Sequence, residues 1–185
     1  MNRVLVVSGH TDLNDSVANK TILEELAKDL PDAEFDYLDR EYPDYKIDVE
    51  AEQKKLAAAD VIVLQFPLFW YSMPSILERW MEETFVHGFS HGSTGDKLHG
   101  KKLILSVTIG APEEMYTKEG HNVHSLDEYL VKVPQIARFT GMDLAGEVAT
   151  YGVSYMMRTT PEGLASIKEK AKAHADKVAK IIASL

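Results

Sequence analysis

The first stretch of the sequence that can do chemistry runs from Gly9 to Asn19 and leads into a predicted helix. A helix start offers unpaired N–H groups and the positive end of the helix dipole, and together these favour an anion such as a phosphate. Ser16 and Asn19 add a hydroxyl and an amide, and His10 can add a further donor or a positive charge. An alternative of about equal weight is that Ser16 only caps the helix and that His10 is a polar loop residue.

The second stretch is Phe66 to Pro74, in which six of nine residues are large and apolar or aromatic and a proline stands near each end. Each proline restricts the backbone around it, so we expect a comparatively rigid loop. Such a loop suits a flat, hydrophobic ring such as the isoalloxazine of a flavin. A dimer interface or a helix-packing cluster would use the same residue types, and a site at a subunit boundary would use them for both purposes.

The third stretch runs from Thr108 to Tyr116 and continues to His121. Gly110 permits a ligand to approach the backbone closely, and the small side chain of Ala111 leaves room for this approach. Backbone N–H groups here can meet the pyrimidine end of a flavin, where negative charge builds on reduction. Tyr116 and His121 are titratable residues in a loop that should overhang the same edge. Each alone is more often a surface residue than a catalyst, so the hypothesis depends on the convergence of the three loops.

Strand-like and helix-like segments alternate along the chain and must position these loops. Short apolar runs predict strands, and apolar residues at helical spacing predict the helices between them. The predicted strands lie at 4–7, 35–38, 61–66, 103–108 and 142–150, and the predicted helices lie at 18–30, 51–58, 76–85 and 125–140 and from 161 onward. Pro134 is a potential kink in the helix 125–140, and Gly141 supplies its C-terminal stop.

Five strand–helix units without a break in composition favour an α/β fold, a doubly wound parallel sheet with helices on both faces. Two strand orders compete, and the dinucleotide-binding order usually has a G-x-G-x-x-G motif after its first strand. The segment Ser8 to Asn14 has a single glycine, so we choose the flavodoxin-like five-stranded parallel sheet of order 2-1-3-4-5. Strands 1, 3 and 4 are neighbours in this order, so the loops after them should meet at one edge and hold the ligand there.

Composition limits the other classes of function. The 185 residues are 45% apolar and 26% charged, which is typical of a globular protein and fits a single flavodoxin-like domain over residues 1–185. The net charge of −9 disfavours nucleic acid and anionic membrane surfaces, so an anionic ligand must be held by directed donors. The absence of cysteine excludes disulfides and thiolate chemistry, and we expect no metal site. No apolar run approaches the roughly 20 residues of a membrane span, so we expect a cytoplasmic protein without direct membrane insertion.

The motifs resemble those of the flavodoxin-like NAD(P)H:quinone oxidoreductases. This family includes DT-diaphorase-type enzymes, drug-activity modulators and the ancillary flavoproteins of glutathione-gated potassium efflux. The resemblance is strongest from residue 4 to residue 142, and the run from Gln65 to Pro74 is its most specific part. The other motifs are Gly9-His10, Ser16-x-x-Asn19, His87-Gly88-Phe89, Leu98-His99-Gly100-Lys101, and Thr108-x-Gly110 before Tyr116.

The resemblance implies an FMN cofactor, with FAD as the alternative, and NAD(P)H as co-substrate. The implied cofactor-binding residues are His10, Ser16, Val17, Ala18 and Asn19 for the phosphate, Pro67, Leu68, Phe69, Trp70 and Tyr71 for the ring, and Thr108, Ile109, Gly110 and Ala111, with Tyr116, for the pyrimidine edge. Tyr116 and His121 match a family tyrosine and histidine proposed to stabilise the reduced flavin, so they are the implied catalytic residues. Ile109 and Ala111 replace a threonine and a glycine that are common in the family, and His121 sits one residue earlier than the histidine of the longer animal enzymes.

The resulting hypothesis is an oxidoreductase that passes a hydride from NAD(P)H through the flavin to a quinone-like acceptor by a ping-pong mechanism. The resemblance also implies a homodimer, with the aromatic stretch 66–89 near its interface. Two alternatives stay open. One is a one-electron flavodoxin-type carrier, which binds FMN but does not react with nicotinamide. The other is a regulatory flavoprotein subunit bound to a potassium-efflux transporter.

Overall fold

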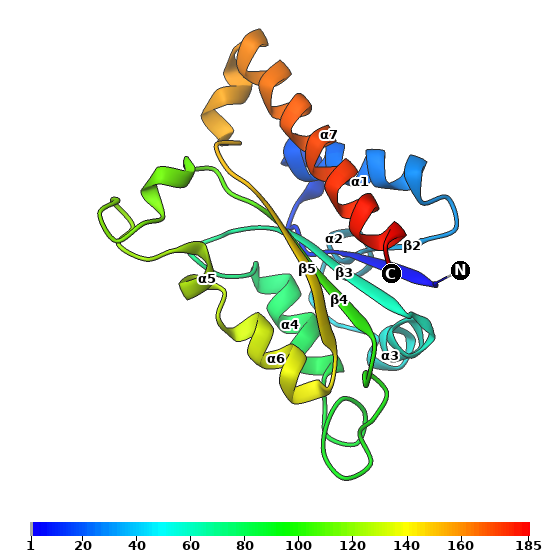
Figure 1. The fold of residues 1–185 in the computed structure, drawn as a ribbon. Coiled ribbons are helices and arrows are strands. Elements are labelled where there is room, and N and C mark those ends of the chain that lie inside the picture. Colours follow the sequence, from blue (N-terminus) through cyan, green and yellow to red (C-terminus); the bar gives the residue numbers. More distant parts are fainter. Residues whose placement is uncertain (1) are drawn as a thin grey trace.

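The computed structural model describes residues 2–185, which contain a parallel sheet of five strands in the order β2-β1-β3-β4-β5 (Figure 1). The strands are β1 (Val4–Ser8), β2 (Glu34–Tyr37), β3 (Val61–Pro67), β4 (Lys102–Thr108) and β5 (Asp143–Thr150). Every neighbouring pair runs parallel. This is the predicted strand order, and it confirms the flavodoxin-like fold class.

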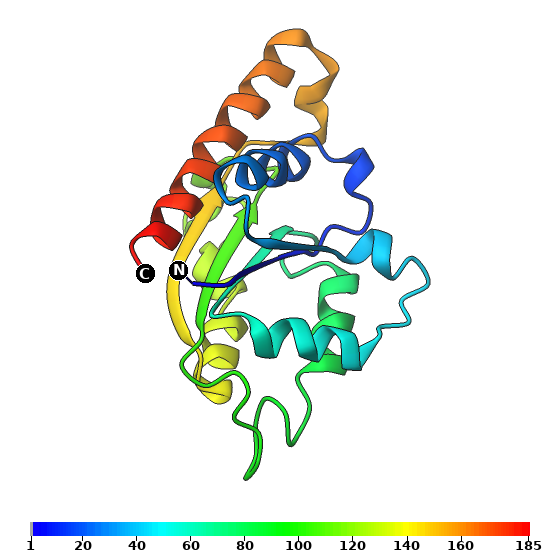
Figure 2. The same cartoon turned by 90° about the vertical axis from the view of Figure 1, so that its right-hand side faces the viewer.

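Helices cover both faces of the sheet (Figures 1 and 2). One face carries α1 (Ala18–Asp29) and α7 (Pro161–Ala183), and the other carries α3 (Val49–Ala58), α4 (Ser75–Thr84) and α6 (Lys132–Thr140). Because β3 is buried over its whole length, its alternate side chains enter different cores. Val61 and Val63 join the α1/α7 core, and Ile62 and Leu64 join the other.

The predicted helix over 125–140 is wrong in one respect, because the structure divides it into two helices. These are α5 (Leu126–Tyr129) and α6, separated at Leu130 and Val131. Pro134 lies in the first turn of α6, where its missing N–H leaves no hydrogen bond unmade. Gly141 ends α6 in the left-handed conformation at φ 71°, as predicted. The short helix α2 (Leu38–Glu41), which includes the last residue of the predicted second strand, was not predicted.

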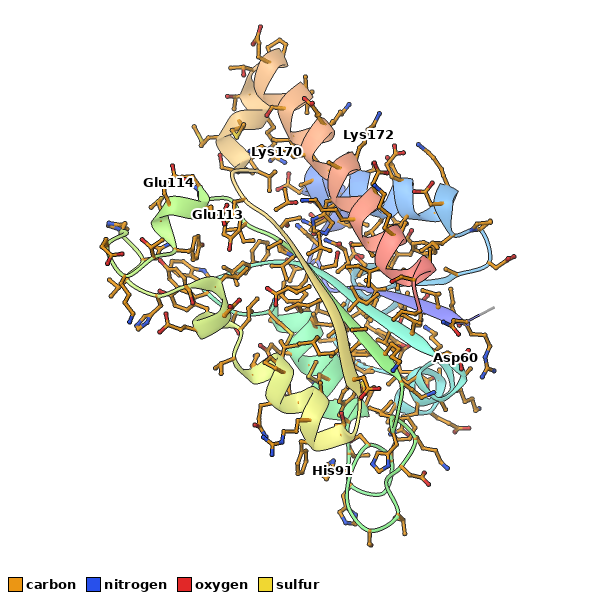
Figure 3. All side chains as sticks on the ribbon, in the orientation of Figure 1. Asp60, His91, Glu113, Glu114, Lys170 and Lys172 are labelled. Carbon is orange, nitrogen blue, oxygen red and sulfur yellow. The ribbon has the colours of Figure 1, made fainter. Side chains whose placement is uncertain are left out.

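The carboxyl ends of the strands meet at one end of the molecule, where the three predicted loops lie. In Figure 3, Glu113 and Glu114, which follow β4, are at this end, whereas Asp60, which precedes β3, and His91, in the loop before β4, are at the opposite end. Within residues 2–185, no helix combines the length and apolar character needed to cross a membrane.

A buried acidic cluster ties α3 and α4 to the outer strand β2. Glu52 accepts hydrogen bonds from the Tyr42 hydroxyl at 2.6 Å and from the Trp80 indole N–H and the Lys55 ammonium at 2.7 Å each. Lys55 also donates to one carboxyl oxygen of Asp36 at 3.0 Å, and the other oxygen of Asp36 has no partner among the described residues. Burial and then the adjacent Glu52 raise the pKa of Asp36 to about 8. Glu52, with three donors, therefore carries the negative charge of the pair.

We predict that Asp36→Asn removes part of the pH dependence of stability. Native Asp36 keeps its proton up to about pH 8, whereas the unfolded chain releases it near pH 4, so wild-type stability falls as the pH rises through this window. Asparagine stays neutral. Between pH 5 and pH 8.5, the free energy of unfolding should therefore shift in favour of the variant by about 3–4 kcal/mol, since each pH unit between the two pKa values contributes about 1.4 kcal/mol. Urea unfolding at both pH values measures this shift.

The matched control is Asp32→Asn, a change of the same type at an exposed position. The difference in the free energy of unfolding between this variant and the wild type should be the same at both pH values. If Asp36→Asn behaved like this control, the native protein would not hold a proton on Asp36.

Candidate functional site

The loops that follow β1, β3, β4 and β5 enclose a pocket of about 260 Å³ at the carboxyl edge of the sheet. The predicted site residues that line it are His10, Ser16, Val17, Ala18, Asn19, Pro67, Leu68, Phe69, Thr108 and Gly110. The structure therefore brings together three segments that are far apart in the sequence. The predicted residues that lie outside this lining are Trp70, Tyr71, Ile109, Ala111, Tyr116 and His121.

A larger hollow of about 430 Å³ lies beside the segment 29–33 and the end of α7. Its lining is mostly apolar and includes the carboxylates of Asp29 and Asp32 but no basic side chain among the described residues. These groups repel an anion. The chemistry of the lining therefore favours the smaller pocket as the functional site.

The groups suited to a phosphate lie at the start of α1. Ser16 Oγ accepts a hydrogen bond from the Asn19 backbone N–H at 3.1 Å, so Ser16 does cap the helix. It also accepts from the Asn19 side-chain amide at 3.1 Å. With both lone pairs used, the Ser16 hydroxyl hydrogen is free to point into the pocket. Capping and anion binding are therefore compatible, and the N–H groups of residues 17 and 18 lie in the open first turn.

His10 lies in the pocket as a neutral donor rather than as a positive charge. Burial lowers the pKa of its imidazole, although Asp39, Asp12 and Asp15 act in the opposite direction. Its Nδ1 accepts a hydrogen bond from the Asp12 backbone N–H at 3.0 Å, which places the ring proton on Nε2. The imidazole also meets the Phe69 ring edge to face at 5.5 Å between centroids. His10 thus joins the first loop to the second and keeps one N–H available.

The aromatic second loop ends in a tight turn with a strained backbone. Phe69 and Ser72 exchange both backbone hydrogen bonds at 3.0 Å, and Trp70 and Tyr71 between them have φ values of 47° and 63°. This left-handed region costs residues other than glycine roughly 1–2 kcal/mol each. The turn holds the Trp70 side chain 93% exposed, next to the pocket-lining Phe69. Strain retained at such a place points to a functional constraint on the loop.

The third loop presents Gly110 to the pocket and keeps Ile109 in the core. Ile109 is buried, its N–H donates to the Thr150 carbonyl at 2.8 Å, and its carbonyl accepts from Val153 at 3.1 Å. Its polar groups are therefore engaged by the segment that follows β5. Gly110 lines the pocket, and a Cβ added there would meet Ser154 only at 3.6 Å, so the space in front of it is open.

Tyr116 lies in an aromatic cluster that ties the third loop to the second. The Tyr129 ring stacks on Tyr71 at 4.7 Å and meets Tyr116 at 6.1 Å. Burial raises the pKa of Tyr116, so its phenol is protonated at neutral pH. His121 is exposed, and the next residue, Asn122, accepts a hydrogen bond from the Tyr71 hydroxyl at 3.4 Å. The segment that continues the third loop therefore contacts the aromatic turn at Tyr71, and the catalytic roles of Tyr116 and His121 stay predictions.

The sequence analysis missed a fourth loop, which follows β5. Arg158 donates to the backbone carbonyl of Asp15 at 2.5 Å and to its carboxylate at 2.8 Å, and its guanidinium lies 3.3 Å from the Tyr155 ring centroid. Arg158 therefore brings a positive charge to the pocket. The lining residues that were missed are Asp15, Val153, Ser154, Tyr155, Arg158 and Ile167. For Val153, Ser154, Tyr155 and Arg158 the signal is topological, because a fifth parallel strand must end at the same edge as the others.

The fold and the pocket define an α/β protein of the flavodoxin type, with a ligand site where the parallel strands end. A family model described as a flavodoxin-like fold matches residues 2–175. The chain belongs to this flavodoxin-like family, and the membership predicted from its motifs is confirmed.

Three relatives show how close the similarity is. General stress protein 14 of Bacillus subtilis (strain 168) is 39% identical over 153 residues, which cover 83% of this chain and 87% of the relative. A second protein of that strain, named uncharacterized NAD(P)H oxidoreductase YrkL, is 35% identical over 156 residues, which cover 84% and 89%. Among solved structures, general stress protein 14 of Treponema denticola in complex with FMN matches with a TM-score of 0.87 at 26% identity, over 97% of this chain and 99% of that one.

Proposed function

We propose that this protein is a cytoplasmic, FMN-dependent NAD(P)H oxidoreductase that works as one domain over residues 1–185. The observation that carries the proposal is the pocket in which the start of α1, the aromatic loop and Gly110 meet. Two relatives support it, because one is named an NAD(P)H oxidoreductase and the other was solved with FMN.

The pocket lining fits the phosphate of FMN on one side. Ser16 offers a hydroxyl, His10 offers its Nε2–H, and the first turn of α1 offers the N–H groups of residues 17 and 18. Arg158 adds a positive charge, which Asp15 partly balances. Directed donors thus provide, within an acidic protein, the local attraction that its overall charge does not.

The other side of the pocket fits a flat ring. Pro67, Leu68 and Phe69 give it an apolar wall, and the strained turn keeps Trp70 exposed beside this wall. Gly110 leaves room for a ligand to approach the backbone. The residues that would surround the ring are therefore Pro67, Leu68, Phe69, Trp70, Tyr71, Thr108 and Gly110, with Ile109 and Ala111 behind them.

When bound, FMN supplies the two-electron chemistry that amino-acid side chains lack. The protein would orient it, and the phenol of Tyr116, the imidazole of His121 and the N–H of Gly110 would stabilise negative charge at the pyrimidine edge. NAD(P)H and a quinone-like acceptor would use the same open face in turn, which is a ping-pong order. The exposed Trp70 at this face suits planar substrates of both kinds.

We predict that the purified protein binds added FMN and that anaerobic NADPH or NADH then bleaches the bound flavin. A water-soluble quinone should restore the flavin absorption, because the reduced site passes its electrons on. Absorption spectra measure each step, with free FMN as the control. A protein that retains no flavin would contradict the proposal, and a bound flavin that nicotinamide leaves oxidised would favour the one-electron carrier.

We predict that Tyr116→Phe and His121→Ala each lower kcat/KM. The loss should be about tenfold, below the roughly 100- to 1000-fold loss on removing an oxyanion-hole donor, because backbone donors remain. Steady-state kinetics measure it. Tyr45→Phe, which removes a phenol hydroxyl that pairs with Ser75, is the control and should turn over normally. Wild-type turnover in both variants would refute the two assigned roles.

We infer a homodimer with the stretch 66–89 near its interface, because Trp70 and Val86 in this stretch are exposed apolar residues. Sedimentation should give twice the mass of one chain, and Val86→Asp should shift the equilibrium toward the monomer. A wild-type protein that sediments as a monomer at all concentrations would contradict this inference. Binding to a potassium-efflux transporter stays a separate prediction, which co-purification from membranes tests.

A further inference from the structure

A chain of hydrogen bonds, buried except at its two ends, crosses the sheet on the face that α1 and α7 cover. It begins at Thr150, the last residue of β5, whose hydroxyl lies 2.8 Å from Nδ1 of His174 in α7. Nε2 of His174 lies 2.7 Å from the hydroxyl of Ser106 in β4. Ser106 in turn lies 2.5 Å from the side-chain carbonyl oxygen of Gln65 in β3. The first half of the chain thus joins α7 to three strands.

The second half of the chain reaches the start of α1. The Gln65 amide donates to the side-chain oxygen of Asn19 at 2.8 Å. The Asn19 side-chain amide has two hydrogens and donates to two hydroxyl oxygens, that of Thr108 at 3.0 Å and that of Ser16 at 3.1 Å. Ser16 and Thr108 both line the pocket. The chain therefore ends at the phosphate side of the site.

All hydrogen bonds in this series are donated in the same direction, from the Thr150 end toward the Ser16 end. Gln65 presents an oxygen to Ser106, so Ser106 must donate its single hydrogen there. Ser106 can then only accept from His174, which places the imidazole proton on Nε2 and leaves Nδ1 to accept from Thr150. Burial lowers the pKa of His174 to about 3, so the ring carries one proton at neutral pH.

At the Ser16 end of the hydrogen-bond series, this direction determines whether the Ser16 hydroxyl donates to the pocket or accepts from it. Ser16 Oγ accepts from the backbone and the side chain of Asn19, so its hydrogen must leave toward the pocket. If the Asn19 amide were turned over, its oxygen would face Ser16. The Ser16 hydroxyl would then donate inward and present a lone pair to an anion.

We propose that Ser106 and His174 are positioning residues that hold the Ser16 hydroxyl as a donor toward an anionic group in the pocket. The inference rests on the proposed function, in which this group is the phosphate of FMN. Neither residue lines the pocket, so both act through Gln65 and Asn19. The four side chains of Asn19, Gln65, Ser106 and His174 are buried, and an unpaired buried polar group is costly, so a bond between them cannot reverse without the others.

The test is a double-mutant cycle on the affinity for FMN, measured by quenching of flavin fluorescence. Ser106→Ala frees the Gln65 amide to turn, so it should weaken FMN binding about tenfold, which is typical of losing a hydrogen bond to a charged group. Ser16→Ala should weaken binding by a similar factor. Because both changes remove the same donor, the double variant should bind about as tightly as either single variant.

Riboflavin, which lacks the phosphate, separates positioning from general structural damage. Its affinity should change less than about twofold in Ser106→Ala. Thr140→Val is the matched control, because it removes another buried hydroxyl, one that bonds only within α6 on the opposite face. This control should leave both affinities unchanged. Equal weakening for FMN and riboflavin, or additive losses in the double variant, would overturn the inference, whereas a wild-type protein that binds no FMN would instead refute the proposed function.

A second test uses the wild-type protein and therefore does not depend on the folding of any variant. The nitrogen-15 chemical shifts of the His174 ring report its tautomer. The proton should lie on Nε2, and the tautomer should persist when FMN is added. A ring protonated on Nδ1 would mean that the hydrogen bonds of the series are donated in the opposite direction, which would overturn the inference.

Discussion

The polar residues at the carboxyl ends of β3 and β4 impose the constraint on which the rest of the structure depends. Both strands are covered by helices on both faces, so Gln65 and Ser106 cannot reach water and must find partners inside the protein, while Thr108 lies at the floor of the pocket. Asn19 and His174 supply those partners from α1 and α7. The same hydrogen bonds that satisfy the buried strands therefore fix the start of α1 at the edge of the sheet, where Val17, Ala18 and Asn19 line the pocket.

The charge of the protein makes this arrangement necessary. A net charge of −9 repels anions in general, so a phosphate site depends on short-range donors. His10 contributes as a neutral donor because burial lowers the pKa of its imidazole. Arg158 contributes a positive charge while it also ties the segment after β5 to the first loop through Asp15. The site thus offers donors for an anion within an otherwise acidic protein, and four loops that converge at the pocket supply these donors.

The aromatic turn beside the pocket has a strained backbone conformation. Trp70 and Tyr71 both adopt the left-handed conformation, which glycine would adopt at lower cost. The turn keeps one ring exposed beside the pocket and stacks the other on Tyr129. Through Tyr129, the third loop packs against the second, so Tyr116 is tied to the aromatic turn although it does not line the pocket.

The sequence by itself determined the sheet, its strand order and the three loops, because apolar periodicity and the missing glycine motif are local signals. It also marked Gly141 as the end of a helix, but not the break before α6, because Pro134 is tolerated equally by a kinked helix and by a first turn. Only the tertiary structure decided that Ile109 faces the core and that Arg158 reaches the pocket. Both outcomes depend on how the segment after β5 packs across the sheet edge, and contacts between residues far apart in the chain leave no periodic trace in the sequence.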